Sequence, residues 1–523
     1  MKKLWLIHPF LLASAPLLFL LAHNIGQVEA SAVLAPLGVV LAVTAVLLGL
    51  TCLVLRQPTR AALLVSLLVG LFFIYGHVFH AIQDLDVFAR TRDLHLALGL
   101  VFVGLLVTGA RYLLRTPRDL MEPSRFLTLL AGISILFSAN DVFQGVRARA
   151  ALAGERAPQA RPSRVEHEDP ALPDVYHIIL DGYAREDVLK DVYQFDNSGF
   201  TRFLRDRGFF VADQSVANYP LTFMSVASTL NMRYLDDVIA TLDADSKDHK
   251  PFYDLIHDHE VGRFFQSKGY RYVHFNTNYG GTETSLIADQ SYQFRHPLLQ
   301  NEFTTVLLRT YLHWMPQPSV ADLHLFMLDK LDEVPRIEGP TYTLFHLLLP
   351  HNPYVFDRHG NVRANIPLEY QWTLKTGGWA ARQQYLEQMI YLNGRIQAAI
   401  EHILATSKHP PIIIVHGDHG SASTHPGQQV VDKHQWGPFI RERTGILNAY
   451  YVPDEVRRHL SPSITPVNSF RLLLKHRFDA QLEPLEDRSF ITWYDKPFDI
   501  MEVTEQVLPR AATPPAPAAR ELP

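Results

Sequence analysis

The sequence contains a single cysteine, Cys52, and no excess of basic residues. One cysteine cannot form an intrachain disulfide, and it cannot supply the paired thiolates of a structural zinc site. The 53 acidic residues outnumber the 48 basic ones, which gives a net charge of −5. A nucleic-acid binder needs a basic stripe to neutralise phosphates, so the composition argues against nucleic acid as a partner. The sequence also shows no internal repeat.

Charged residues are scarce in the first 145 residues, where five long apolar runs follow one another. A helix that crosses a bilayer needs about 20 such residues. We therefore predict a transmembrane domain of five helices over residues 1–145. The predicted spans are Leu4–Ala22, Ala32–Leu55, Ala61–Ile82, Leu94–Leu114 and Phe126–Val142, of which the last is the shortest.

The charged residues between these runs differ in sign from one side to the other, as the positive-inside rule expects. Basic residues lie on one side: Lys2, Lys3, Arg56, Arg60, Arg111, Arg115, Arg118 and Arg125. Acidic residues predominate on the other: Glu29, Asp84, Asp86 and Asp93, against Arg90 and Arg92. Five spans with a cytoplasmic N-terminus place the chain after Val142 outside the cytoplasm. The alternative for Leu4–Ala22 is a cleaved signal peptide, which leaves that orientation unchanged.

The remaining residues have the composition of a globular domain. Residues 146–172 are rich in Ala, Arg, Pro and Glu and predict a linker, and the Ala/Pro-rich residues 509–523 predict a disordered tail. Between them, at residues 173–508, short apolar runs alternate with amphipathic stretches. The runs are Val175–Leu180, Tyr272–Phe275, Tyr342–Leu349, Ile412–Val415 and Asn448–Val452. This alternation predicts an α/β domain with a mainly parallel central sheet flanked by helices.

Three of these apolar runs are followed by polar residues that could bind a metal ion or a phosphate. Asp181 follows the first run, His351 follows Tyr342–Leu349, and Asp418 and His419 follow Ile412–Val415. Taken one at a time, Asp181 is as well explained as a turn or helix-capping aspartate. Ligands of parallel sheets bind beyond the carboxyl ends of the strands, so together these residues predict one site. Two carboxylates and an imidazole suit zinc or manganese.

A hydroxyl nucleophile is available between the first two of these strands. Pro220 marks the start of a predicted helix, which places Thr222 in its first turn. The free amides and the positive dipole end of a helix favour a bound phosphate there, and a metal ion would lower the pKa of the hydroxyl. The alternative is that Thr222 only caps the helix. Three rival hydroxyls on the same helix are better explained as packing residues: Ser225, Ser228 and Thr229.

Four short motifs thus follow the apolar runs in order. They are Asp181, Thr222-Phe-Met-Ser225-Val226, Pro350-His351-Asn352-Pro353-Tyr354 and Asp418-His419-Gly420. With these motifs the chain resembles the membrane-anchored branch of the alkaline phosphatase and sulfatase superfamily, over essentially its whole length. That branch includes lipoteichoic acid synthases, phosphoglycerol transferases and phosphoethanolamine transferases. The resemblance implies five membrane helices followed by an extracytoplasmic sulfatase-like domain.

The resemblance also implies roles for the matching residues. Asp181, Thr222, Asp418 and His419 would bind the metal, Thr222 would be the nucleophile, and His351 would contact a second metal or the phosphate. The chain departs from the family in lacking disulfides. The last family histidine has no clear equivalent, because His425 and His434 straddle its position, and Asn276 is a further pocket candidate. No Cys/Ser-x-Pro-x-Arg sequence surrounds Thr222, which argues against sulfate-ester hydrolysis.

We therefore expect a metal-dependent membrane transferase that moves a phospholipid head group, of phosphoglycerol or phosphoethanolamine type, to an envelope glycan or lipid. The intermediate would be a phospho-threonine. One alternative is a membrane-anchored phosphodiesterase or phosphatase that uses the same residues with water. Another is a non-catalytic envelope protein for binding or assembly. A transporter is disfavoured, because the predicted spans carry no charged residue at mid-depth.

Overall fold

The computed structural model describes residues 5–24, 33–83, 91–155, 172–243, 246, 248–294, 319–363, 379, 381–426, 432, 436–494 and 496–508. The predicted tail at 509–523 and most of the predicted linker lie outside these ranges. The chain divides into two compact units. The first is Met1–Gln159 with Arg295–Gln317, and the second is Ala160–Phe294 with Pro318–Pro523.

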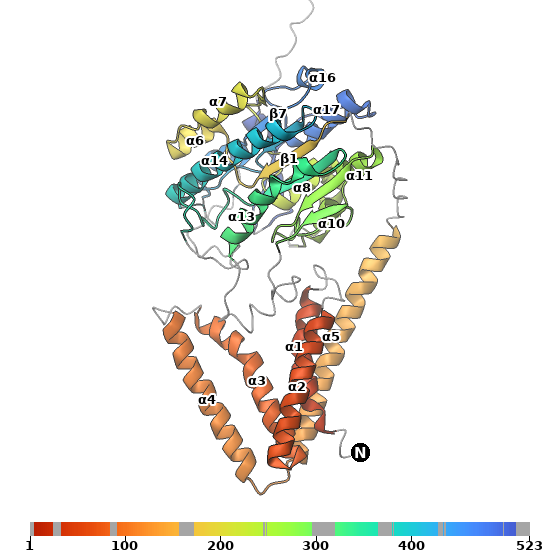
Figure 1. The fold of residues 1–523 in the computed structure, drawn as a ribbon, viewed down its shortest axis with the longest axis vertical. Coiled ribbons are helices and arrows are strands. Elements are labelled where there is room, and N and C mark those ends of the chain that lie inside the picture. The colour runs from red at the N-terminus through yellow and green to blue at the C-terminus, as the bar shows by residue number, and fades with distance from the viewer. Residues whose placement is uncertain are drawn as a thin grey trace, which may run out of the picture. The chain divides into compact units, whose positions relative to one another are not determined.

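The described part of the first unit contains five helices, which Figure 1 shows. They are α1 (His8–Asn24), α2 (Leu34–Leu55), α3 (Pro58–Gln83), α4 (Thr91–Arg115) and α5 (Met121–Glu155). Four of them, α2 to α5, are long and apolar enough to cross a membrane. Helix α1 has only 17 residues, or about 26 Å at 1.5 Å per residue, which is short for a hydrocarbon core of about 30 Å. The prediction of five full-length spans is therefore confirmed for four.

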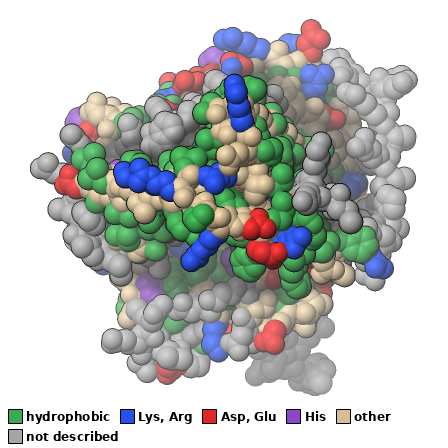
Figure 2. Space-filling view, turned by 90° about the horizontal axis from the view of Figure 1, so that it is seen from below, with side chains coloured by type: hydrophobic (Ala, Val, Ile, Leu, Met, Phe, Trp, Pro, Cys, Tyr) green, Lys and Arg blue, Asp and Glu red, His purple; other side chains and the backbone are tan. Residues whose placement is uncertain are grey.

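Contacts inside this unit place Arg60 and Arg125 near the helix ends that the sequence assigns to the basic side. Arg60, at the start of α3, donates to the carbonyls of Leu114 and Thr116 at the end of α4. Arg125, near the start of α5, lies 5.9 Å from the ring centre of Trp5. Figure 2, seen from the lower end of Figure 1, shows Lys and Arg side chains among hydrophobic ones. The helix ends that the sequence assigns to one side of a membrane are thus neighbours.

Helix α1 runs beside α5. The carbonyl of Trp5 accepts a hydrogen bond from Thr128 at 3.1 Å, and further along Val142 packs against the cluster that contains Leu17 and Leu21. Helix α5 continues to Glu155, beyond the predicted end of the last span at Val142. Six of the thirteen added residues, 143–155, are Ala or Arg, which are strong helix formers, so the helix continues beyond the apolar run. It ends opposite the basic end.

The second unit is built on a seven-stranded sheet of order β2-β7-β6-β1-β5-β3-β4. The strands are β1 (Val175–Leu180), β2 (Phe210–Val211), β3 (Arg271–Phe275), β4 (Gln290–Tyr292), β5 (Thr341–Leu347), β6 (Ile412–His416) and β7 (Asn448–Tyr451). All five predicted strands are present, and the short β2 and β4 were not predicted. Pairings β1–β5, β1–β6, β3–β4 and β3–β5 are parallel, while β7 is antiparallel to β6 and β2. The sheet is therefore mixed, with its parallel pairings in the centre and on one side.

Helices cover both faces of this sheet (Figure 1). One face packs against α6 (Glu186–Tyr193), α7 (Ser198–Asp206), α13 (Val320–Leu331) and α14 (Arg382–Thr406). The other packs against α8 (Thr222–Asn231), α10 (Lys250–His257), α11 (Glu260–Ser267) and α17 (Pro466–Phe478). Along β1, Tyr176 and Ile178 face the first layer while Val175 and Ile179 face the second. Burial on both sides explains why the strand is apolar throughout.

Shorter elements complete the unit. They are α9 (Asp236–Ile239), the 3-10 helix Val334–Arg336, α15 (Gly437–Thr444), α16 (Asp454–Arg457), α18 (Thr504–Val507) and the hairpin of β8 (Phe490–Ile491) with β9 (Met501–Glu502).

Candidate active site

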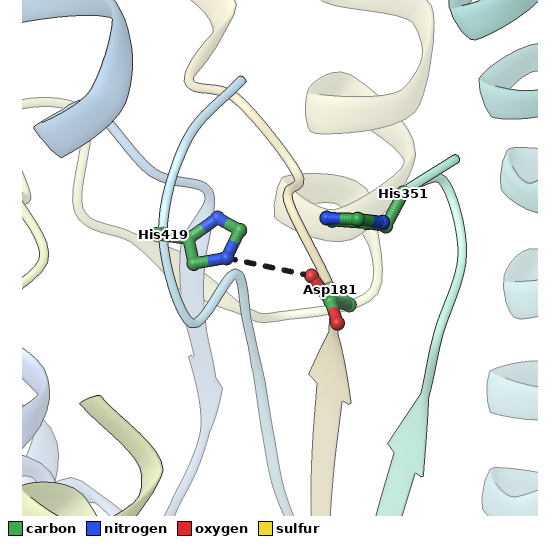
Figure 3. A group of neighbouring side chains, drawn as sticks. All are labelled: Asp181, His351 and His419. Carbon is green, nitrogen blue, oxygen red and sulfur yellow. Dashed lines mark ion pairs between the residues drawn. The ribbon is translucent and has the colours of Figure 1, made fainter. Parts of the chain in front are cut away.

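The candidate site lies where three neighbouring parallel strands end (Figure 3). Asp181 directly follows β1, and its N–H donates to the carbonyl of Leu347 on β5 at 3.0 Å. His351 follows β5, and its N–H donates to the carbonyl of Asp181 at 3.0 Å. After β6, Asp418 accepts a hydrogen bond from the N–H of Gly182 at 3.0 Å. The three strand ends that the sequence singles out therefore meet, as parallel pairing requires.

The loop that carries Asp418 and His419 is tightly packed against the rest of the unit. Nε2 of His419 lies 3.6 Å from a carboxylate oxygen of Asp181 and 3.4 Å from one of Asp418. A Cβ atom added to Gly420 would stand only 2.1 Å from the carbonyl oxygen of Glu442. Only glycine fits at that position, which explains why it follows His419.

Thr222 is the hydroxyl of α8 that faces this cluster. It is the first residue of the helix, and its Oγ1 lies 3.1 Å from Nε2 of His419. The other three hydroxyls of α8 donate to backbone carbonyls: Ser225 to Asp418 at 2.6 Å, Ser228 to Arg233 at 2.6 Å and Thr229 to Ser225 at 2.9 Å. Those three are bonded to the backbone, whereas the hydroxyl of Thr222 contacts a side chain of the cluster.

His346, on β5, is part of the site although the sequence did not single it out. Its Nε2 lies 3.7 Å from the carboxylate of Asp181, and its Nδ1 lies 2.8 Å from the hydroxyl of Thr282. The available signal was a histidine near the end of a strand that also leads to His351, five residues later. Sequence reasoning used this strand only to position His351.

A buried glutamine holds the loop of His351. Gln388 of α14 donates to the carbonyl of His351 at 2.9 Å and accepts from the N–H of Val355 at 2.8 Å. Because Gln388 is fully buried, these bonds are not exposed to competition from water. The position of His351 thus depends on a helix that lies far from it in the sequence.

The buried acceptors of the site show how well a metal ion would fit. Both carboxylate oxygens of Asp181, Oδ2 of Asp418 and Nε2 of His346 have no hydrogen-bond partner among the described residues. Buried polar atoms are normally satisfied, so convergent unsatisfied acceptors indicate a cation. The residues form two possible ligand groups, Asp181–His351–His419 and Asp181–His346–Asp418, each with ligand atoms within 4.8 Å of one another. Carboxylate and imidazole donors fit zinc or manganese.

The histidine tautomers agree with this assignment. We place a proton on Nδ1 of His419, which donates to the carbonyl of Gly420 at 2.9 Å. Nδ1 of His351 likewise donates to the carbonyl of Asn352 at 2.6 Å. In both rings the lone pair is then on Nε2, the nitrogen that a metal ion or an acidic hydroxyl would meet.

The two carboxylates titrate as a coupled pair. Burial raises the pKa of Asp181, but His351, His346 and His419 together lower it by more than burial raises it. The net shift of the pKa is therefore downward. Burial and the charge of Asp181 raise the pKa of Asp418 to about 7. Without a cation, one carboxylate keeps its charge at the expense of the other, whereas a bound divalent ion would favour the ionised form of both.

The three weaker candidates are placed differently. His425 stacks on Trp493 at 4.3 Å between ring centres and belongs to neither ligand group. Asn276 follows β3, where its N–H donates to the carbonyl of Tyr292 at 2.9 Å. His434 lies outside the described residues. Their proposed contact with substrate or a second metal stays a prediction.

Comparison with known proteins gives similarity at the level of structure. No family model matches the chain, and no curated protein matches its sequence. The structure is similar to the C-terminal periplasmic domain of EptC from Escherichia coli in complex with zinc, at 10% identity and a TM-score of 0.41. That alignment covers 65% of this chain and 97% of that one.

Two further solved structures are similar. The integral membrane lipooligosaccharide phosphoethanolamine transferase A of Neisseria meningitidis aligns at 12% identity and a TM-score of 0.37, over 90% of this chain and 94% of that chain. An alkaline phosphatase superfamily protein from Vibrio parahaemolyticus aligns at 11% identity and a TM-score of 0.38, over 64% and 80%. These similarities are distant, so we argue the function from the site alone.

Proposed function

We propose that the chain is a metal-dependent membrane enzyme that transfers a phospholipid head group through a phospho-threonine intermediate. One observation carries the proposal. The hydroxyl of Thr222 lies 3.1 Å from His419, whose Nε2 lies near buried oxygens of Asp181 and Asp418. Both oxygens of Asp181 and Oδ2 of Asp418 have no hydrogen-bond partner in the described part of the chain. A hydroxyl in contact with a cation site is the arrangement that phosphoryl chemistry needs.

The residues divide the work as follows. Asp181, Asp418 and His419, with Thr222 itself, would hold zinc or manganese. The ion would lower the pKa of the hydroxyl and offset negative charge on the phosphate. Thr222 would lose its proton to solvent when it binds the ion, and its Oγ1 then forms a bond to phosphorus as the bond to the diacylglycerol oxygen breaks. His351, protonated on Nε2, gives its proton to that leaving oxygen. An acceptor hydroxyl on a glycan or lipid reverses the attack and frees Thr222, and Nε2 of His351 takes the proton of that hydroxyl.

The helices of the first unit support a membrane location. Four are long and apolar enough to span, and α1 begins at the basic end beside α5. We infer that this basic end is cytoplasmic, following the positive-inside rule. If α1 also spans, the chain leaves α5 on the opposite side, which puts the catalytic domain outside the cytoplasm, within reach of a lipid donor. Alkaline phosphatase fused after Glu155 should be active if α1 crosses the membrane, because the end of α5 then lies outside the cytoplasm. It should be inactive if α1 does not cross the membrane.

The test is a direct search for the intermediate. Full-length protein in detergent, supplied with zinc or manganese, is incubated with phospholipid labelled in the head group. We expect mass spectrometry to find the phosphorylated head group on the peptide that contains Thr222, and to find none in Thr222→Ala. Labelled head group on another residue, or none at all in the parent, would contradict the proposal.

The same incubation separates a transferase from a hydrolase. Water and a sugar hydroxyl would use the same residues, so the structure does not favour one of them. With candidate glycans or lipids present, a transferase moves the label to the acceptor. Release of free head group at one rate, whatever the acceptor, would instead identify a phosphodiesterase.

A further inference from the structure

Arg443 of α15 lies between the nucleophile and the loop of the metal ligands. None of its surface is exposed to solvent. Nε donates to the carbonyl of Pro220 at 2.7 Å, and Nη1 donates to the carbonyl of Gly420 at 3.0 Å. Pro220 stands two residues before Thr222, and Gly420 directly follows His419. The guanidinium therefore ties the start of α8 to the Asp418–His419 loop.

No carboxylate among the described residues lies within ion-pair distance of this buried cation, and Asp418, Asp181 and Glu442 act on its charge from further away. Its Nε and Nη1 donate to neutral carbonyls, Tyr494 lies close to the guanidinium, and Nη2 has no hydrogen-bond partner in the described part of the chain. The carboxylate of the adjacent Glu442 accepts its hydrogen bonds from other residues. It accepts from Tyr193 at 2.8 Å, Ser421 at 2.8 Å, the N–H of Ser423 at 2.7 Å and the N–H of Thr424 at 2.7 Å. A buried guanidinium with an unpaired N–H is costly unless an anion binds to it.

Aromatic side chains fix the guanidinium beside the site. It lies 5.8 Å from the ring centre of Trp379 and 5.2 Å from that of Trp493. Trp379 in turn packs edge-on against His351 at 4.8 Å and covers Gly182, where an added Cβ would stand 2.6 Å from the indole. These two rings and the bond to the carbonyl of Gly420 hold the guanidinium next to the loop of His419.

We propose that Nη2 of Arg443 binds a non-bridging oxygen of the phosphate that is held against Thr222. This inference rests on the proposed function and adds a catalytic residue to it. The metal ion and the guanidinium would then share the charge of the phosphate between them. The start of α8 supports the same anion, because Leu221 at the N-cap position provides no side-chain cap for the first amides.

The test measures binding of inorganic phosphate to full-length protein loaded with zinc, in detergent, by the shift of the unfolding temperature. Replacing Arg443 with Met keeps much of the volume and removes the charged donor. We expect the dissociation constant for phosphate to rise by about 10- to 100-fold in Arg443→Met, with zinc content unchanged. Arg443→Lys keeps the positive charge but lacks the planar guanidinium. Its dissociation constant for phosphate should lie between those of the parent and Arg443→Met.

Arg441→Met is the matched control. Arg441 lies on the same helix, but it is half-exposed and pairs with Asp187 and Asp191 at 3.0 Å and 2.5 Å. The Arg441→Met protein should bind phosphate with the same dissociation constant as the parent. The inference is overturned if Arg443→Met binds phosphate like the parent. It is also overturned if this variant loses zinc together with phosphate, because Arg443 would then act only by holding the loop.

A second measurement uses only the parent protein, so it does not depend on whether Arg443→Met folds. In a structure of the zinc-loaded parent with inorganic phosphate, a phosphate oxygen should lie within hydrogen-bonding distance of Nη2 of Arg443. A phosphate beside Thr222 that makes no such contact would overturn the inference. These binding tests need no turnover. If phosphate binds through Arg443 but phospho-Thr222 never forms, the proposed transfer fails and the anion site stands.

Discussion

The second unit contains two sets of buried polar side chains that differ in how their hydrogen bonds are met. In the first set, Nε2 of His177 on β1 lies 2.8 Å from Nε2 of His416 on β6, and Nδ1 of His416 donates to the carbonyl of Gly417 at 2.8 Å. His259 continues the pattern, since its Nε2 lies 3.0 Å from Tyr272, which lies 3.3 Å from His274.

The second set is the candidate site, which is as deeply buried but contains two aspartates beside its histidines. There, however, the carboxylate oxygens of Asp181, one oxygen of Asp418 and Nε2 of His346 are unsatisfied within the described ranges. A buried polar network whose bonds are complete stabilises the fold, whereas one whose acceptors converge without donors is prepared for a ligand. The comparison predicts that the histidines of the first set stabilise the fold and that those of the second set bind a ligand.

The largest effect should come from the nucleophile. Thr222→Ala should lower turnover by on the order of 10⁴-fold or more, because the attacking oxygen is removed. Thr229→Ala, on the same helix, removes a hydroxyl that only donates to the carbonyl of Ser225. Its turnover should stay within a few-fold of the parent. Assays of head-group release from labelled phospholipid compare the three proteins, and equal losses in both variants would contradict the assignment.

The first set, made of His177, His416, His259, Tyr272 and His274, is called the satisfied set below. A change in it should lower stability and leave the metal in place. His177→Leu keeps a similar volume but leaves the buried Nε2 of His416 without its donor, at a cost of about 1–3 kcal/mol in the free energy of unfolding. Denaturant titration measures that cost, and metal analysis should show the metal content of the parent. Loss of metal from a stably folded His177→Leu would break the distinction between the two sets.

Acid should weaken the satisfied set through its histidines. Burial lowers the pKa of His259 to about 3 and that of His274 to about 4. The unfolded chain takes up protons near pH 6.5 while the folded chain does not, so stability falls as pH drops from about 6.5 toward 4. The loss should approach about 2 kcal/mol per histidine at pH 5. Unfolding followed between pH 7.5 and 5 should show a smaller slope in His259→Gln, and an unchanged slope would argue against the shift.

The smallest effect concerns a cap remote from both sets. Ser319 and Asp322 form a capping box at the start of α13, with the hydroxyl accepting from the N–H of Asp322 at 3.2 Å. Ser319→Ala should cost about 1 kcal/mol of stability and change neither metal content nor turnover. Thermal unfolding and the lipid assay check both parts. A fall in turnover at full metal content would mean that α13 contributes to the site.

Much of this arrangement could be predicted from local sequence. The apolar runs identified the strands, and the parallel direction of β6, β1 and β5 follows from the alternation of apolar runs with helices. Asp181, His351, Asp418 and His419 each follow such a run within four residues, so their meeting at one edge was expected. Thr222 was identifiable because Pro220 marks the helix start, and the structure explains the choice by engaging Ser225, Ser228 and Thr229 elsewhere.

The rest depends on contacts that no local pattern encodes. His346 lies within its strand, and only the pairing of β5 with β1 brings it to Asp181. Arg443 is more than 20 residues beyond His419, on a helix whose packing cannot be inferred from its own sequence. The antiparallel β7 and the extension of α5 to Glu155 likewise follow from tertiary pairing and helix propensity, and not from apolar length.

The central claim is that the unsatisfied set holds a divalent metal ion. The most direct measurement is the zinc and manganese content of full-length protein purified in detergent without chelators, for the parent, Asp181→Asn and His177→Leu. The parent and His177→Leu should retain at least one ion per chain, and Asp181→Asn should lose it, because Asp181 belongs to both ligand groups. A parent that binds neither metal, or an Asp181→Asn protein with the parent's metal content, would contradict the account.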